Sequence, residues 1–410
     1  MSTSSFVARQ PILDINDGVY GYELLYRRGQ DNWFDGSDPD QASATVIDDS
    51  LTVFGLESLA PAPTRAFVNF GRNALLSEAW RVLPSDRVII ELLENVSADD
   101  EVLAACRQLR EDGYALALDD FSGRPDVMPL VAMADIVKVD LLATVGADRE
   151  RVATWLRKRA VRMLAEKVET KEELAEAKRL GFTLFQGYHF CKPEMIKKGT
   201  LAPQKLSYLR LIDELNRPTT SLERMEAILQ CDVALAVKLL RYLNSPGFGL
   251  KKRVTSLRQA LMLVGERPFK RWATVLAMRM ISSDKPRELM VVSLLRARFC
   301  EALAAASGLQ QRELELFLVG LLSTVDALLD RPMSEVLDEL PLAPDVREAL
   351  LGAPSGLGSV YALVRAWEGG DWAAVSEAVK ALGLDDAMVA EIYRSSVDWV
   401  QQTTSQAEAA

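Results

Sequence analysis

The sequence predicts an eight-stranded, (β/α)8-like barrel with one antiparallel strand, followed by an all-helical domain. Three observations predict this fold: short apolar runs recur from residue 6 to residue 188, amphipathic segments lie between them, and strand-like runs stop after Pro203. The chain has 410 residues, more than one core usually holds, so we expect at least two domains. We assign residues 1–202 to the barrel domain, residues 203–400 to the helical domain and residues 401–410 to a disordered tail.

The first two apolar runs, residues 6–12 and 19–26, are expected to form a hairpin. They flank the turn-rich link from Asp14 to Gly18, which predicts one antiparallel strand. The later runs alternate with amphipathic segments at residues 99–111, 148–158 and 171–180, a pattern typical of βα units with nearly parallel strands. Eight such strands close into a barrel whose active site lies at the carboxyl ends of the strands. The six later runs are residues 66–70, 88–94, 116–121, 136–140, 163–169 and 184–188.

After Pro203 the apolar residues fall at helical spacing, which predicts an all-helical second half. The turn sequence Asn244-Ser245-Pro246-Gly247 is expected to end one helix, and residues 354–358 to connect two later helices. The small, polar residues from Gln401 to Ala410 are expected to fray. The helical spacing is carried by Val233, Val237, Leu240, Leu243, Leu257, Leu261, Val264, Phe317, Leu321 and Leu322.

Composition excludes several classes of protein. With 49% hydrophobic and 26% charged residues the chain resembles a soluble globular protein, and no apolar stretch approaches the length of a membrane span, so we expect a cytoplasmic protein without a membrane partner. The four cysteines form no C-x-x-C pair, which argues against disulfides and structural zinc. The net charge of −10 disfavours nucleic acid as a partner, and the basic run from Lys251 to Arg271 is interpreted as a solvated helix surface.

Polar side chains that can bind a cation stand near the ends of the predicted strands. Carboxylates that converge on one pocket would raise one another's pKa unless a cation neutralised them, so the pattern predicts a metal. Carboxylate oxygens with one amide suit Mg²⁺ or Mn²⁺ better than zinc, and adjacent acids can serve two ions, as in displacement at phosphorus. The candidate ligands are Glu23, Asn69, Glu91, Asp119 and Asp120.

The order of these residues, from Phe6 to Pro193, resembles the EAL family of cyclic di-GMP phosphodiesterases, with Glu23-Leu24-Leu25 at the position of the signature Glu-Ala-Leu. The resemblance implies hydrolysis of cyclic di-GMP to linear pGpG at a two-metal site for Mg²⁺ or Mn²⁺. It also implies a role for each residue: Glu23, Asn69, Glu91 and Asp119 as ligands of the first metal, Asp119 and Asp120 as ligands of the second, Lys138 and Gln186 as residues that hold the attacking water, Glu166 as a base or water ligand, Arg27 as a phosphate contact, and Glu94 as a residue that stabilises the neighbouring loop.

Two departures from the family pattern leave a second function open. The family's Asp-Asp-Phe-Gly-Thr-Gly-Tyr-Ser loop is replaced by the sequence from Asp119 to Asp126, and Lys167 replaces the glycine of Glu-Gly-Val-Glu. Either change could slow turnover and leave nucleotide binding intact, because transition-state placement tolerates less error. The alternative is therefore a weak or inactive domain that acts as a cyclic di-GMP receptor or an interaction scaffold. Considered alone, Lys138 could equally neutralise Asp140 or another nearby acid, and Arg27 could be structural.

The helical half resembles the HDOD domain, a relative of HD phosphohydrolases, over residues 205–400. Where an active HD enzyme shows Leu-Leu-His-Asp, this chain reads Leu321-Leu322-Ser323-Thr324, and its one histidine is His189. A histidine-metal hydrolase is therefore excluded for the helical domain. We expect a regulatory or output module that binds a protein partner, and a homodimer is left open. The resemblance rests on residues 232–235, 239–245, 248–249 and 256–265.

Overall fold

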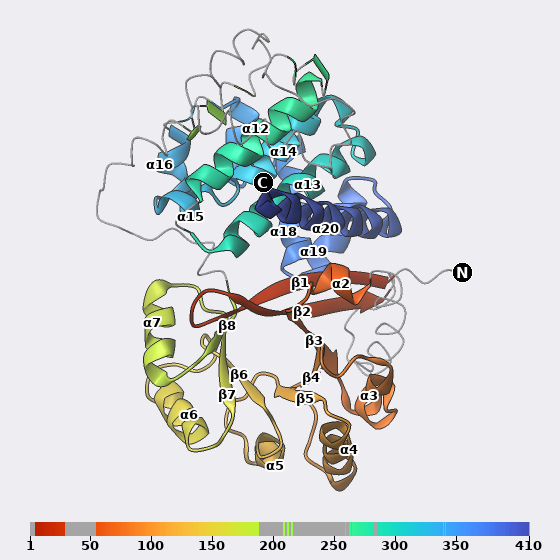
Figure 1. Ribbon diagram of the computed structural model, residues 1–410, viewed down its shortest axis with the longest axis vertical. Coiled ribbons are helices and arrows are strands. Elements are labelled where there is room, and N and C mark those ends of the chain that lie inside the picture. The colour runs from red at the N-terminus through yellow and green to blue at the C-terminus, as the bar shows by residue number, and fades with distance from the viewer. Residues whose placement is uncertain are drawn as a thin grey trace. The chain divides into compact units, whose positions relative to one another are not determined.

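A computed structural model (Figure 1) describes residues 5–28, 55–187, 265–282, 285–338 and 342–409, with isolated positions between 208 and 263 and at Leu340. The chain forms two compact units. Unit 1 comprises Met1–Phe190, Arg365–Val379 and Asp385–Glu391, and unit 2 comprises Cys191–Val364, Lys380–Leu384 and Ile392–Ala410. The predicted domain boundary at residues 202 and 203 lies outside the described residues and stays a prediction.

Eight strands form a closed barrel in sequential order, as predicted. Strand β1 is antiparallel to both of its neighbours, β2 and β8, and every other neighbouring pair is parallel. The hairpin is closed by Asp14, whose Oδ1 accepts hydrogen bonds from the backbone N–H groups of Asn16 and Gly18. The strands are β1 (Ser5–Asp14), β2 (Val19–Arg28), β3 (Arg65–Phe70), β4 (Val88–Leu92), β5 (Ala115–Leu118), β6 (Ile136–Asp140), β7 (Arg162–Glu166) and β8 (Leu184–Phe185).

Helices cover the outside of the barrel (Figure 1). Local sequence sets their ends: Asp99 caps α4 by accepting from Val102 N, Thr170 and Glu173 form a capping box for α7, and Gly181 ends α7 in the left-handed conformation. Their apolar faces pack on the outward side chains of the strands in one buried core. The elements are α2 (Leu56–Leu59), α3 (Arg72–Leu76), η1 (Ala79–Val82), α4 (Asp100–Glu111), η2 (Pro125–Val127), α5 (Met128–Val131), α6 (Ala147–Arg157) and α7 (Lys171–Leu180).

A second, smaller apolar cluster fills the inside of the barrel. It consists of inward side chains contributed by seven strands, because alternate residues of a strand point to opposite faces. The backbones come close here: a Cβ at Gly21 would lie 2.5 Å from the carbonyl oxygen of Arg65. This cluster is the floor beneath the polar residues described below. Its members are Ile12, Phe67, Ile89, Ala117, Ile136, Leu164 and Leu184.

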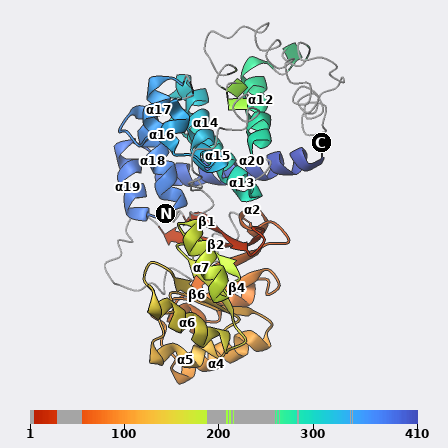
Figure 2. The same cartoon turned by 90° about the vertical axis from the view of Figure 1, so that its left-hand side faces the viewer.

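All described elements after residue 265 are helical, as predicted. Helix α13 packs along α14, and α17 lies against α14 (Figure 2). No helix among the described residues combines the length and the apolar character of a membrane span. The elements are α12 (Glu266–Ile281), α13 (Arg287–Ala306), η5 (Gln310–Arg312), α14 (Glu313–Leu322), α15 (Val325–Leu329), α16 (Met333–Asp338), α17 (Pro344–Leu350), α18 (Gly356–Glu368), α19 (Trp372–Ala381) and α20 (Asp386–Ala409).

One expectation is corrected at the C-terminus. The tail over residues 401–410 was expected to be disordered, but helix α20 continues to Ala409. Neither glycine nor proline occurs after Asp386, so no residue interrupts the helix. The apolar pattern from Val233 to Leu261, the turn at Asn244 to Gly247 and the basic residues from Lys251 to Arg258 lie outside the described residues.

Candidate metal-dependent active site

Strands β2 to β8 each place one polar side chain at the carboxyl end of the barrel. On β3, β4, β6 and β7 the polar residue stands two positions after an inward apolar residue, as Glu91 follows Ile89, so its side chain must also point inward. Asp119 and Gln186 follow directly after β5 and β8 in the same alternation. The seven residues are Glu23, Asn69, Glu91, Asp119, Lys138, Glu166 and Gln186, all of them predicted site residues.

Lys138 lies at the centre of this polar layer. Its Nζ lies 2.5 Å from Glu91 Oε1, 2.8 Å from Glu166 Oε1, 2.9 Å from Asp119 Oδ1 and 3.4 Å from Glu23 Oε2. The lysine side chain is 1% exposed. One ammonium cannot neutralise four carboxylates, so the layer retains an excess of negative charge when all four acids are ionised. Lys138 therefore pairs with the site acids and not with Asp140, whose cationic partner is Lys167.

This charge imbalance shifts the pKa values of the cluster. Burial lowers the pKa of Lys138, but the four surrounding carboxylates outweigh burial and raise the pKa well above the ordinary lysine value. Burial raises the pKa of Glu91 well above its usual range, against the attraction of Lys138. Burial likewise raises the pKa of Glu166 to about 8. Lys138 stays protonated, and the buried acids are strongly disposed to gain a proton or a second cation.

Four buried oxygen atoms in this layer accept no hydrogen bond within the described structure: Asn69 Oδ1, Glu91 Oε2, Glu166 Oε2 and Gln186 Oε1. A buried polar atom without a partner costs about 1–3 kcal/mol, so four in one layer are suited to binding a ligand. Two of these atoms are carboxylate oxygens and two are amide oxygens, the donors that hard divalent cations prefer. The residues present therefore fit a divalent metal.

Amide side chains hold the Glu23 carboxylate in place. Gln186 Nε2 donates to Glu23 Oε2 at 2.6 Å, and Asn69 Nδ2 donates to Glu23 Oε1 at 3.3 Å. Gln186 Nε2 also contacts Gln10 Oε1 at 3.0 Å. Gln10 was not predicted as a site residue, although the hairpin register pairs it with Glu23. The sequence pattern could have identified Gln10, because it lies two positions from the inward Ile12 and therefore also points inward. In β1 the polar residue precedes the apolar one, because this strand is antiparallel to its neighbours.

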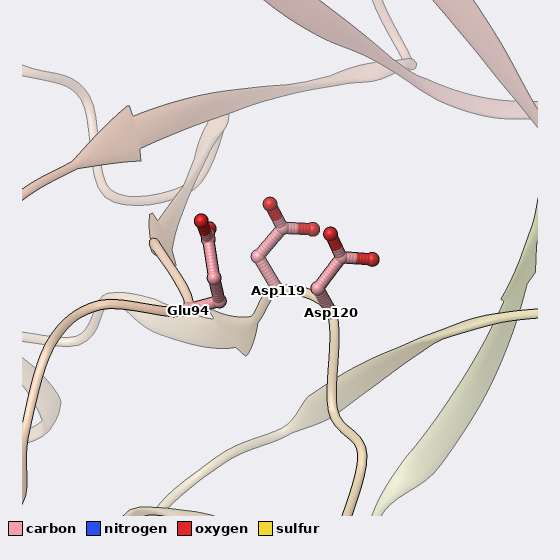
Figure 3. Close-up of side chains that lie close together, drawn as sticks. All are labelled: Glu94, Asp119 and Asp120. Carbon is pink, nitrogen blue, oxygen red and sulfur yellow. The ribbon is translucent and has the colours of Figure 1, made fainter. Parts of the chain in front are cut away.

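A second group of acids lies at the rim of the barrel, where Glu94, Asp119 and Asp120 present carboxylate oxygens within 4.8 Å of one another (Figure 3). Figure 3 shows the three side chains pointing to the same side of the loops that carry them. Burial and Asp119 raise the pKa of Asp120, whereas the ammonium of Lys167 lowers it. The predicted role of the Glu94 side chain in stabilising the neighbouring loop stays a prediction; the backbone carbonyl oxygen of Glu94 accepts from Arg124 Nη2 at 2.6 Å. The carboxylate itself lies where it could also hold a cation.

The predicted role of Arg27 stays a prediction. Arg27 belongs to strand β2, but its side chain lies outside the described residues, as does the whole of His189. The loop from Ser122 to Asp126, which departs from the family pattern, includes Arg124, whose Nη2 lies 3.5 Å from Asp126 Oδ2. Ser122 and Arg124 line the hollow beside Glu94, Asp119 and Asp120.

The chain was compared with family models and with known proteins. The EAL domain model matches residues 66–193, and the HDOD domain model matches residues 201–333. Cyclic di-GMP phosphodiesterase CdgJ of Vibrio cholerae is 36% identical over 389 residues, which cover 93% of this chain and 89% of that protein. Uncharacterized protein YuxH of Bacillus subtilis is 34% identical over 402 residues, which cover 96% of this chain and 97% of that protein.

Among solved structures, the Bacillus subtilis YkuI protein, an EAL-domain protein in complex with cyclic di-GMP and calcium, is 20% identical with a TM-score of 0.40, over 60% of this chain and 64% of that one. Klebsiella pneumoniae BlrP1 with manganese and cyclic di-GMP is 24% identical with a TM-score of 0.39, over 45% of this chain and 54% of that one.

Proposed function

The chain belongs to the family of proteins that join an EAL domain to an HDOD domain, and on that premise we propose that it hydrolyses cyclic di-GMP to linear pGpG. The observation that carries the proposal is the polar layer of the barrel. Its buried carboxylates outnumber the one ammonium, and four of its oxygens have no hydrogen-bond partner. The name of the Vibrio cholerae relative, a cyclic di-GMP phosphodiesterase identical at 36% of positions, supports the same reaction.

The metal is proposed to be Mg²⁺ or Mn²⁺, at two positions. Glu23, Asn69, Glu91 and Asp119 would hold the first ion, and Asp119 with Asp120 would hold the second. Support comes from the all-oxygen donor set and from the shared position of Asp119, which contacts Lys138 and also belongs to the rim group with Glu94. When bound, such ions supply positive charge at the phosphodiester and make a water molecule more acidic.

The chain's own residues would divide the remaining work. Lys138, held between Glu91 and Glu166, presents a permanently charged ammonium that orients an attacking water and attracts developing negative charge. Glu166 has one oxygen on Lys138 and the other, Oε2, without a partner, so Oε2 is the atom proposed to take the water's proton. Gln186 fixes Glu23 through Nε2 and leaves Oε1 to accept a hydrogen bond from the same water. Arg27 is proposed to bind a phosphate.

Hydrolysis is tested with the full chain, cyclic di-GMP and Mg²⁺ or Mn²⁺, with pGpG quantified by chromatography. Glu23→Gln keeps the shape of the side chain but removes its charge, so we expect a loss of at least about 10²-fold in kcat. Glu101→Gln, on the exposed face of α4, is the matched control and should retain the wild-type rate. A wild type that forms no pGpG with either ion would contradict the proposed reaction.

A second candidate function is a cyclic di-GMP receptor, or a scaffold. It is favoured by the altered loop from Ser122 to Asp126 and by Lys167, which forms an ion pair beside the metal-side acids. Saturable binding of cyclic di-GMP without pGpG would indicate the receptor, and absence of binding would leave the scaffold. A protein partner bound through the HDOD domain, a homodimer and a cytoplasmic location all remain predictions.

A further inference from the structure

Lys167 places a cation at the rim of the barrel, directly after Glu166. Its Nζ lies 2.5 Å from Asp140 Oδ2, and Asp140 pairs with Glu166 in the register of β6 and β7. The side chain of Asp140 is 10% exposed and that of Lys167 is 56% exposed. The ammonium therefore reaches from the solvent side onto a nearly buried carboxylate, next to the strand end that carries Glu166.

The carboxylate that receives Lys167 is itself firmly held. Asp140 Oδ1 accepts from the backbone N–H groups of Leu142 at 2.6 Å and Ala143 at 3.1 Å. Buried Arg149 fastens the same loop by donating from Nε to the carbonyl oxygen of Thr144 at 2.9 Å and from Nη2 to that of Leu141. Asp140 cannot move without breaking these bonds, so the acceptor of the ion pair is fixed.

The backbone under Lys167 is also constrained. Lys167 has a left-handed φ of 52°, which a side chain other than glycine adopts at a cost. The next residue is fixed, because Val168 N donates to Gln186 O at 3.0 Å, and a Cβ at Gly187 would lie 2.3 Å from Val168 O. A strained turn held between β7 and β8 keeps the lysine at this point of the rim.

The field of this ammonium acts on the rim acids. Phe121 N donates to the carbonyl oxygen of Lys138 at 2.9 Å, so the neighbouring Asp120 stands beside the carboxyl end of β6, where Asp140 holds Lys167. A divalent cation bound by Asp119 and Asp120 would feel the same ammonium as a repulsive charge. Repulsion between a fixed unit charge and a bound divalent ion remains appreciable at the low effective dielectric of a partly buried site.

We propose that Lys167, fixed by Asp140, weakens the binding of a second divalent cation at Asp119 and Asp120, so that the two metal positions fill at different cation concentrations. This inference rests on the proposed function, because it assumes that the rim acids take a cation. It makes Lys167 a positioning residue that regulates metal occupancy and does not touch the reacting atoms. Turnover would then depend on the concentration of free divalent ion and not on substrate alone.

The test is a calorimetric titration of Mn²⁺ into the chelator-treated full chain. Lys167→Asn removes the charge and tolerates the left-handed backbone, so we expect the weaker Mn²⁺ to bind about tenfold more tightly than in the wild type. Lys167→Arg keeps the charge and should stay within about twofold of the wild type.

Lys167→Gly serves as a second neutral variant, because glycine adopts the left-handed turn without strain, and it should match Lys167→Asn. In hydrolysis assays both neutral variants should reach half-maximal rate at about tenfold lower Mn²⁺. Two Mn²⁺ affinities that are unchanged in both neutral variants would overturn this inference and leave the proposed function standing. A wild type that binds no Mn²⁺ and forms no pGpG would overturn the inference together with the function.

Discussion

The carboxyl end of the barrel and the hydroxyl cluster of Ser293, Ser323 and Thr324 both bury polar side chains, but of these two groups only the barrel residues leave buried oxygens without partners. In the barrel, Glu91 and Glu166 each direct one oxygen to Lys138 and leave the other without a hydrogen bond. Between α13 and the turn that follows α14, the hydroxyl of Thr324 is bonded to that of Ser293, and Ser323 Oγ donates to Gly320 O at 2.6 Å and accepts from Arg296 Nη1 at 3.1 Å. The first arrangement is built for a ligand, and the second is complete as it stands.

The two groups are both buried but differ in residue type: one consists of hydroxyl groups and the other of carboxylates around a lysine. Hydroxyl groups both donate and accept, so neighbouring hydroxyls can satisfy one another without an outside partner. Ionised carboxylates only accept, and four of them around one ammonium exceed what it can satisfy. Ser323 and Thr324, which align with the histidine and aspartate of the HD pattern that this region resembles, instead form part of a hydrogen-bonded core.

Removing the cation from the barrel layer should have the largest effect. Lys138→Met leaves four carboxylates without their ammonium, so we expect the metal-free protein to lose about 3–5 kcal/mol of stability and hydrolysis to fall to background. Because a divalent ion replaces the lost charge, Mn²⁺ should restore part of the stability but not the activity. Denaturant unfolding with and without Mn²⁺ measures both effects. Equal stability of Lys138→Met and wild type without metal would contradict the charge imbalance.

The stability of the metal-free protein should also depend on pH, because of the buried acids of the barrel layer. The pKa of Glu166 is raised from 4.5 to about 8 in the folded chain, so the folded state holds a proton that the unfolded state releases. The contribution of this proton is complete below about pH 4.5 and is lost as pH rises through about 8. The denaturation midpoint of the metal-free protein should therefore fall across this window, whereas the Glu166→Gln variant should show a flatter profile. A midpoint that stays level or rises between these pH values would contradict the raised pKa of Glu166.

The smallest expected effect concerns the helical core. Thr324→Val removes one member of the Ser293 and Thr324 pair, but Ser293 Oγ still donates to Leu289 O at 2.8 Å, so the cost should be about 1 kcal/mol. Hydrolysis of cyclic di-GMP should not change. Thr404→Val, at a half-buried position on α20, is the matched control, because among the described residues the Thr404 hydroxyl bonds to Val400 O and Gln401 O of its own helix. A change in unfolding free energy or Mn²⁺ affinity that is much larger for Thr324→Val would indicate that this core holds more than packing.

Much of the barrel could be predicted because its period is short and its pattern is local. Alternation along each strand, together with turn and cap residues such as Asp14 and Thr170, identified eight strands and the antiparallel hairpin. The same alternation placed Glu91 and Lys138 on the inner face above apolar residues. The pattern does not predict which side-chain atoms come into contact, because those contacts depend on how the barrel closes.

Three particulars show this limit. Gln10 joins the site through an antiparallel strand, and its contact with Gln186 spans 176 positions of sequence. Asp140 was a possible partner of Lys138, but adjacent strand ends bring it to Lys167 instead. Helix α20 extends past Gln401 although the composition there is that of a frayed end, because a helix that is already formed adds each further residue at little cost.

The most direct test of the account is the metal dependence of cyclic di-GMP turnover by the purified chain. After chelation the protein should form no pGpG, and added Mn²⁺ or Mg²⁺ should restore product formation in the wild type but not in Glu23→Gln. Turnover that continues unchanged in the presence of chelator, or cyclic di-GMP binding without any product at saturating Mn²⁺, would contradict it.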